Sequence, residues 1–121
     1  MASNLSVSLA PEAVRSVLGA TIAAGAGAYV NVGTVLAQPA RLILFQNGTD
    51  GDVMVSFDGG ITDHMPIFLG AFVLLDVTTN RTDTGGAFNI SQGSQFAVRT
   101  LGGTFTTPTT RAFFLTSFYA K

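Results

Sequence analysis

Short strand-like segments separated by turn residues constrain the fold of this chain more than any other feature. From residue 28 onward, apolar, β-branched and aromatic runs alternate with clusters of Gly, Asn, Asp and Thr that recur about every 8–12 residues. No helical periodicity lasts for more than two turns. We therefore predict an all-β fold, an antiparallel β-sandwich of about eight strands. A jelly roll and an immunoglobulin-like arrangement both fit this pattern.

The predicted strands all belong to one sandwich domain, which covers residues 28–121. They are residues 28–36, 41–46, 53–58, 67–69, 71–77, 87–90, 95–101 and 111–119. Residues 41–58 are expected to form a hairpin, because Asn47-Gly48 and Asp50-Gly51 supply the positive φ angles that hairpin turns require.

Residues 1–27 are expected to form an N-terminal arm or a first strand. Pro11 and Glu12 can open a short helix over residues 11–18. The pattern of residues 15–22 fits a strand equally well. The Ala- and Gly-rich residues 20–28 are a candidate loose arm that docks on a neighbouring subunit.

The charge content is unusually low. Asp, Glu, Lys and Arg make up 11% of the residues, compared with about 25% in typical soluble domains. A lone domain with so few charges is prone to associate, so we expect neighbouring subunits to cover much of its surface. The alternative is a monomer whose surface consists of Thr, Ser, Asn, Gln and Gly.

The six basic residues are scattered singly along the sequence, and direct nucleic-acid binding is therefore not expected.

Several classes of protein are disfavoured because the sequence lacks the features that they require. It contains no cysteine, which rules out disulfides and thiolate metal sites. The N-terminus does not resemble a secretory signal, and the apolar residues 17–30 are too short to span a bilayer. We therefore expect no membrane association and synthesis in the cytoplasm.

The densest group of chemically capable side chains comprises Asp50, Asp52, Asp58, Asp63 and His64. Carboxylates near a histidine can bind a cation or act as acid and base. Their spacing does not match a calcium loop, because Val53-Met54-Val55 follows Asp52. We interpret the aspartates as turn residues, and the sequence leaves open whether they bind a cation.

His64 is the single candidate general base, and it lacks a nucleophile motif. Asp63 cannot easily orient it, since neighbouring side chains in an extended chain point apart. No glycine-rich segment has the Gly-Lys pair of a phosphate loop. We therefore predict no catalytic, cofactor-binding or metal-binding residues, no small-molecule substrate, and a protein that is not an enzyme.

Consecutive apolar residues point to surfaces outside the core. Phe113 and Phe114 must face opposite sides of the last strand. One of them, or part of Val73-Leu74-Leu75, is expected to face a partner. The alternative is that a loop or the N-terminal segment covers that face.

Several motifs, taken in order, resemble small virion-associated proteins encoded among the structural genes of tailed bacteriophages. They are residues 41–50 (RLILFQNGTD), 53–59 (VMVSFDG), 63–64 (DH), 72–76 (FVLLD), 79–81 (TNR) and 115–119 (LTSFY). The resemblance covers about residues 14–119. It implies a β-sandwich subunit of the capsid, neck or tail without catalytic residues. It also suggests that Asn47, Asp58, Asp76 and Asn80 anchor turns and strand ends.

The expected function is therefore that of a non-enzymatic structural subunit of a tailed-phage virion: a head–tail connector, neck or tail component, or a capsid decoration. Its expected partners are copies of itself and portal, capsid or tail subunits, bound through apolar sheet faces and β-edges. The alternative is a carbohydrate- or receptor-binding module. The absence of Trp and the presence of only two Tyr disfavour that alternative.

Overall fold

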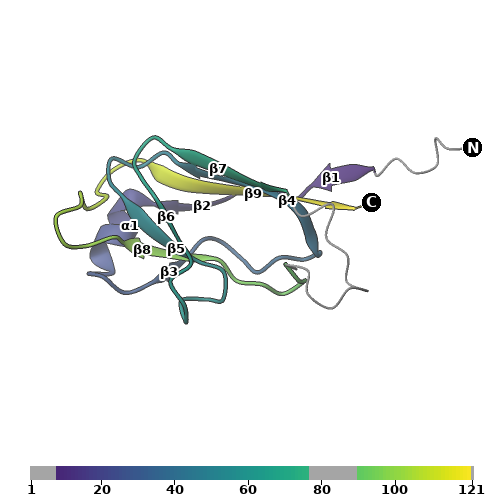
Figure 1. Ribbon diagram of the computed structural model, residues 1–121, viewed down its shortest axis with the longest axis horizontal. Helices are drawn as coiled ribbons and strands as arrows, with labels where there is room; N and C mark the ends of the chain where they lie inside the picture. Colours follow the sequence, from purple (N-terminus) through teal and green to yellow (C-terminus); the bar gives the residue numbers. More distant parts are fainter. Residues whose placement is uncertain (1–7, 77–89, 121) are drawn as a thin grey trace, which may run out of the picture.

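The computed structural model describes residues 8–76 and 90–120, which form two antiparallel sheets packed face to face (Figure 1). The predicted all-β sandwich is thereby confirmed. The larger sheet contains β1 (Leu9–Pro11), β2 (Arg15–Leu18), β4 (Ala40–Asn47), β7 (Phe72–Asp76) and β9 (Ala112–Ala120). The smaller sheet contains β3 (Val30–Asn31), β5 (Val53–Ser56), β6 (Met65–Ile67) and β8 (Ala97–Thr100).

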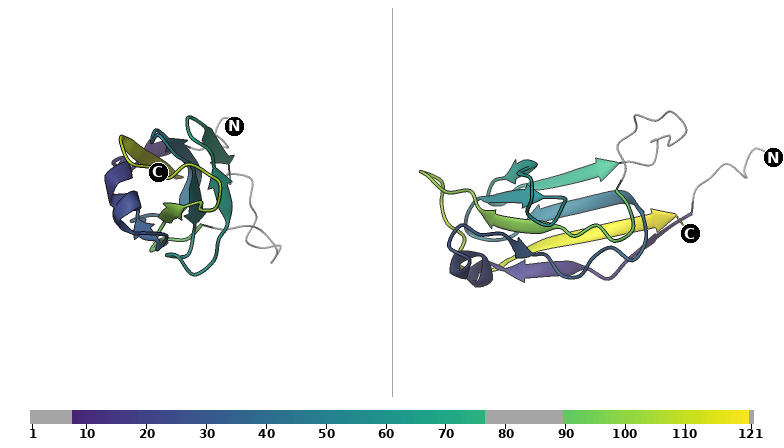
Figure 2. Two further views of the ribbon diagram at one scale, coloured as in Figure 1. Left: turned by 90° about the vertical axis from the view of Figure 1, so that its left-hand side faces the viewer. Right: turned by 90° about the horizontal axis from the view of Figure 1, so that it is seen from below.

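The strand order decides between the two sandwich types. In the larger sheet it is β1-β9-β4-β7, with β2 also pairing with β9, and in the smaller sheet it is β3-β8-β5-β6. Nearly every connection crosses from one sheet to the other (Figure 2). β1 and β2 pair with successive parts of β9 and together occupy one position beside it. Each sheet therefore has four strand positions, and with these crossings the arrangement matches a jelly roll.

The predicted hairpin over residues 41–58 is wrong. β4 pairs with β7 and β9, whereas β5 pairs with β6 and β8. The turn between β4 and β5 therefore carries the chain from one sheet to the other. Its Asn-Gly and Asp-Gly steps do indicate a turn, but turn chemistry alone does not specify which strands pair.

The sequence left a short helix over residues 11–18 and a strand over residues 15–22 open, and the structure has a strand at Arg15–Leu18. Arg15 and Val17 are buried while Ser16 and Leu18 are exposed, which is the alternation of a strand on a core. A helix, α1, follows over Gly19–Ala24. Its Ile22 is fully buried in the core, so this part of the Ala- and Gly-rich segment packs on its own domain rather than forming the expected loose arm.

The other predicted strands are shorter than expected or displaced. The strand predicted at 28–36 is reduced to Val30–Asn31, and the one predicted at 67–69 lies at Met65–Ile67. The strands predicted at 71–77, 95–101 and 111–119 correspond to β7, β8 and β9. Of the strand predicted at 87–90, only Ile90 lies within the described residues, and it is buried outside any strand.

Aromatic rings fill the space between the sheets. Phe45 on β4 lies 5.6 Å from Phe96 and 6.4 Å from Phe113, measured between ring centroids. All three side chains are fully buried. Phe96 directly precedes β8 of the smaller sheet, so these contacts join the two sheets. Burial of this kind is the main source of stability for such a domain. No helix within the described ranges is long and apolar enough to cross a membrane.

Candidate functional site

The outer face of the larger sheet is unusually apolar. Phe113 points into the core and is fully buried, while its neighbour Phe114 points outward and is 38% exposed. On β7, Phe72 and Leu74 point outward and are 69% and 55% exposed, whereas Val73 and Leu75 pack against the core. The predicted opposite orientation of Phe113 and Phe114 is therefore confirmed.

Strand register brings these outward side chains together. Gln46 of β4 lies opposite Phe72 on one side and opposite Phe114 on the other. Leu44 lies opposite Leu74, and Leu42 lies opposite Phe118. Cross-strand neighbours on one face have Cβ atoms about 5 Å apart, so these residues form one surface. We call this surface the outer face: Leu18, Leu42, Leu44, Phe72, Leu74, Phe114 and Phe118.

The predicted turn aspartates are bound to loop backbone rather than to one another. The Asp50 carboxylate accepts hydrogen bonds from the Thr109 and Thr110 amides at 2.7 and 3.0 Å. These bonds, that of Thr109 first, hold the pKa of Asp50 well below its usual range. Asp52 accepts bonds from the amides of Leu69 and Thr106. Both aspartates thus tie the β4–β5 turn to distant loops.

Asp58 anchors the turn after β5. Its carboxylate accepts a 2.6 Å bond from the Ser56 hydroxyl and a 2.9 Å bond from the Thr62 amide. The Ser56 bond is the main reason that the pKa of Asp58 is lowered. His64 stacks on Phe57, and its Nδ1 accepts a 3.0 Å bond from the Phe57 amide. His64 therefore has a structural partner of its own.

Asn47 anchors the end of β4. Its Nδ2 donates to the carbonyl oxygens of Gly51 and Ile67 at 2.9 and 2.8 Å, and its Oδ1 accepts from the Thr49 amide. The predicted anchoring roles of Asn47 and Asp58 are confirmed. Asp76 ends β7, and Asn80 lies outside the described residues.

Asp63 belongs to an exposed cluster on the smaller sheet that the sequence did not reveal. It accepts bonds from the Tyr29 hydroxyl and from Nη2 of Arg99, the latter at 2.8 Å. The Arg99 guanidinium lies 5.6 Å from the Tyr29 ring centroid. Arg99, and then Tyr29, lower the pKa of Asp63. Burial, and then Asp63, raise the pKa of Tyr29 to about 12. These polar groups satisfy one another.

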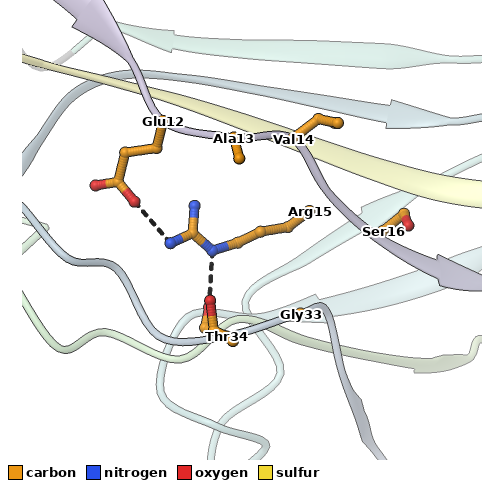
Figure 3. A pocket seen from close by; sticks show the side chains of 7 residues that line it. All are labelled: Glu12, Ala13, Val14, Arg15, Ser16, Gly33 and Thr34. Carbon is orange, nitrogen blue, oxygen red and sulfur yellow. Dashed lines mark hydrogen bonds and ion pairs between the residues drawn. The ribbon is translucent and has the colours of Figure 1, made fainter.

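A second polar cluster is buried between the N-terminal segment and the loop after β3 (Figure 3). Arg15 Nη2 lies 2.7 Å from the Glu12 carboxylate. Arg15 also donates to the carbonyls of Thr34 and Val35, and Glu12 accepts from the Gln38 amide at 3.0 Å. The sequence carried no reliable signal for this pair, because a three-residue spacing favours an ion pair on a helix, whereas Arg15 begins strand β2.

A cavity of about 380 Å³ adjoins this ion pair. It is lined by Glu12, Ala13, Val14, Arg15, Ser16, Gly33 and Thr34. The two charges at its wall already neutralise each other, so the cavity offers no charge to a ligand. Within residues 8–76 and 90–120, no three His, Asp or Glu side chains converge as metal ligands.

Comparisons with protein-family models, with curated proteins and with solved structures found no match to this chain.

Proposed function

We propose that this protein is a non-enzymatic structural subunit that assembles with copies of itself and with other subunits through the outer face of its larger sheet. The apolar character of this face carries the proposal. The face spans four strands and is roughly 400 Å² in plan, from strand spacings of about 4.8 Å and a rise of about 3.4 Å per residue. Apolar patches of this size on a monomer are often interaction sites.

The low charge content supports the same proposal. On the outer face the side chains between the apolar residues include Ser16, Gln46 and Thr116, which are uncharged. Covering a sheet face of this kind with a partner stabilises the complex by about 25 cal/mol per Å² of apolar area that is buried. Asp76, which lies opposite Leu42 at the end of β7, adds a negative charge at the margin of this face.

The sequence resemblance suggests that the assembly is a tailed-phage virion, as a connector, neck, tail or capsid-decorating subunit. The jelly-roll strand order is compatible with this suggestion, because viral capsid domains use that fold. Lectin domains and cupins use it too, so the fold alone does not identify the function. The carbohydrate-binding alternative has less support, because the polar groups of the exposed Tyr29, Asp63 and Arg99 already bond to one another.

Sedimentation velocity on matched variants tests the proposal. Phe114→Ser and Leu18→Ser remove apolar area from two strands of the outer face. They should weaken concentration-dependent association at least tenfold. Ile61→Ser is the control, because Ile61 is 86% exposed but lies in a loop of the other sheet.

The ionic strength provides a second readout. Association through an apolar face should change little between about 0.05 and 0.5 M NaCl, whereas association through surface charges is screened. Equal association of Phe114→Ser and Ile61→Ser, or a protein that stays monomeric at millimolar concentration, would contradict the proposed function.

A further inference from the structure

We infer that β7 pairs edge to edge, antiparallel, with β7 of a second copy, so that the two larger sheets become one continuous sheet. This inference rests on the proposed function, because it names the partner and the register of one contact in the assembly. It starts from the position of β7 at the edge of its sheet, where β4 is its one neighbour among the described strands.

Backbone hydrogen bonding shows which groups of β7 face this edge. The Asn47 amide donates to the Ala71 carbonyl at 3.0 Å, and the next pair in the register is Gln46 with Phe72. In an antiparallel ladder, successive residues direct their N–H and C=O groups to opposite sides. Val73 and Leu75 therefore bond toward β4. Phe72 and Leu74 present theirs to the open edge.

The neighbouring edge strand, β6, is less able than β7 to pair with another strand. β6 is the edge of the smaller sheet on the same side of the sandwich, and residues 68–71 connect it directly to β7. Pro66 lies in the middle of β6 and cannot donate a hydrogen bond. β7 contains no Pro or Lys, the residues that commonly block pairing at an edge, and its one charged residue, Asp76, is the last of the strand. Of these two edges, β7 is the one suited to accept another strand.

A second copy suits this edge because an antiparallel strand is complementary to itself about a two-fold axis. An axis at Val73 places Phe72 opposite Leu74 of the second copy, so the edge-facing N–H and C=O groups of these two residues find partners. The same register pairs apolar side chains on the outer face. It also places Asp76 opposite Gly70 rather than opposite another Asp76, which avoids a like-charge contact.

The size of the contact determines its strength. Five residues span about 17 Å, and the edge of the sandwich presents roughly 300 Å², compared with about 800 Å² per partner in a stable interface. Pairing through β7 alone is therefore weak. Repeated copies in an assembly would add avidity, and the contact would become effective there.

Disulfide trapping of the full chain tests the register. The protein has no cysteine, so one introduced cysteine can form a disulfide only between copies. Val73→Cys places two Cα atoms about 4.5 Å apart across the axis, within the range that a disulfide bridges. Leu75→Cys is the control, because it lies on the same strand and face but about 13 Å from its equivalent.

Val73→Cys should form the oxidised dimer at least tenfold faster than Leu75→Cys. Equal rates, or fastest trapping by Leu74→Cys, would overturn the inference. Hydrogen exchange of the unmodified protein is the second measurement: the amides of Phe72 and Leu74 should become protected as concentration rises, and concentration-independent exchange would also overturn it. If Val73→Cys forms the disulfide dimer no faster than Leu75→Cys while Phe114→Ser still weakens association, this contact is rejected. The proposed function would then still stand.

Discussion

At the scale of single residues, the polar side chains of this protein hold loops in place. Arg15 and Glu12 form a buried ion pair, with side chains that are 8% and 9% exposed. Together they bind the backbone of the loop after β3 at Thr34, Val35 and Gln38. A charge buried this deeply is tolerated because other donors and acceptors of the pair bond to backbone groups, and Arg15 Nη1 donates to the Ser117 hydroxyl.

Breaking this ion pair should destabilise the fold strongly. We expect Glu12→Gln to lower the free energy of unfolding by about 3 kcal/mol, since it leaves the buried Arg15 charge without its partner. Urea denaturation followed by circular dichroism measures the loss. The double variant Glu12→Gln/Arg15→Met should lose less than the sum of the single changes. Fully additive losses would contradict a coupled pair.

The matched comparison is Asp63→Asn, which breaks the exposed ion pair with Arg99. Solvent screens that pair, so its removal should cost much less than removal of the buried one. Similar losses for Glu12→Gln and Asp63→Asn would show that burial does not determine the strength of these contacts.

Tyr29 provides a pH-dependent signal. Its pKa is raised to about 12, by burial first and then by its bond to Asp63, above the ordinary value of about 10. Because the folded state holds this proton more tightly, the stabilisation is complete below about pH 10 and is lost as the pH rises towards 12. The protein contains two tyrosines, so a Tyr119→Phe variant isolates the absorbance change of Tyr29.

In that variant the phenolate should form with a midpoint near pH 12 while circular dichroism still reports a folded chain. Adding Asp63→Asn should move the midpoint part of the way back towards 10, because burial remains. A midpoint near 10 in the folded Tyr119→Phe protein would contradict the assigned environment of Tyr29.

At the scale of secondary structure, α1 begins where the backbone packs against a distant loop. The Gly19 amide donates to the Arg111 carbonyl at 2.8 Å. A Cβ atom at Gly19 would lie 2.4 Å from the Thr110 carbonyl oxygen, a distance that no side chain accepts without backbone movement. Glycine at this position is required by a tertiary contact rather than by the helix.

Gly19→Ala should therefore destabilise the protein although alanine is the better helix former. We expect a loss of about 1–3 kcal/mol from overpacking. Ala20→Gly, at the next and exposed position, should cost about 0.5–1 kcal/mol through helix propensity alone. Urea denaturation ranks the two variants, and a stabilised Gly19→Ala protein would show that the contact with Thr110 relaxes easily.

At the scale of the whole molecule, the two sheets differ in what they leave exposed. The smaller sheet carries the Tyr29, Asp63 and Arg99 cluster, whereas the larger sheet carries the apolar outer face. With 11% charged residues, the chain has little charge with which to solvate both surfaces. The proposed assembly covers the apolar face and the β7 edge, and it leaves the polar cluster of the smaller sheet to water.

Local patterns in the sequence determined the fold class. Alternation of apolar residues identified β7, β8 and β9, because a strand that rests on a core must direct every second side chain inward. It also established that Phe113 and Phe114 face opposite sides. The resemblance suggested Asn47 and Asp58 as anchors, and their oxygens do bond to backbone amides only a few residues away, at Thr49 and Thr62.

Only the tertiary structure decided which strands pair and which polar groups meet. Residues 41–58 contain the signals of a hairpin, yet their two strands lie in different sheets because partners distant in sequence bury each of them better. The contacts of Asp63 with Arg99 and of Arg15 with the loop after β3 likewise join residues that are distant in the sequence. Local sequence specifies alternation and turns, whereas pairing and register depend on contacts between segments that a local pattern does not relate.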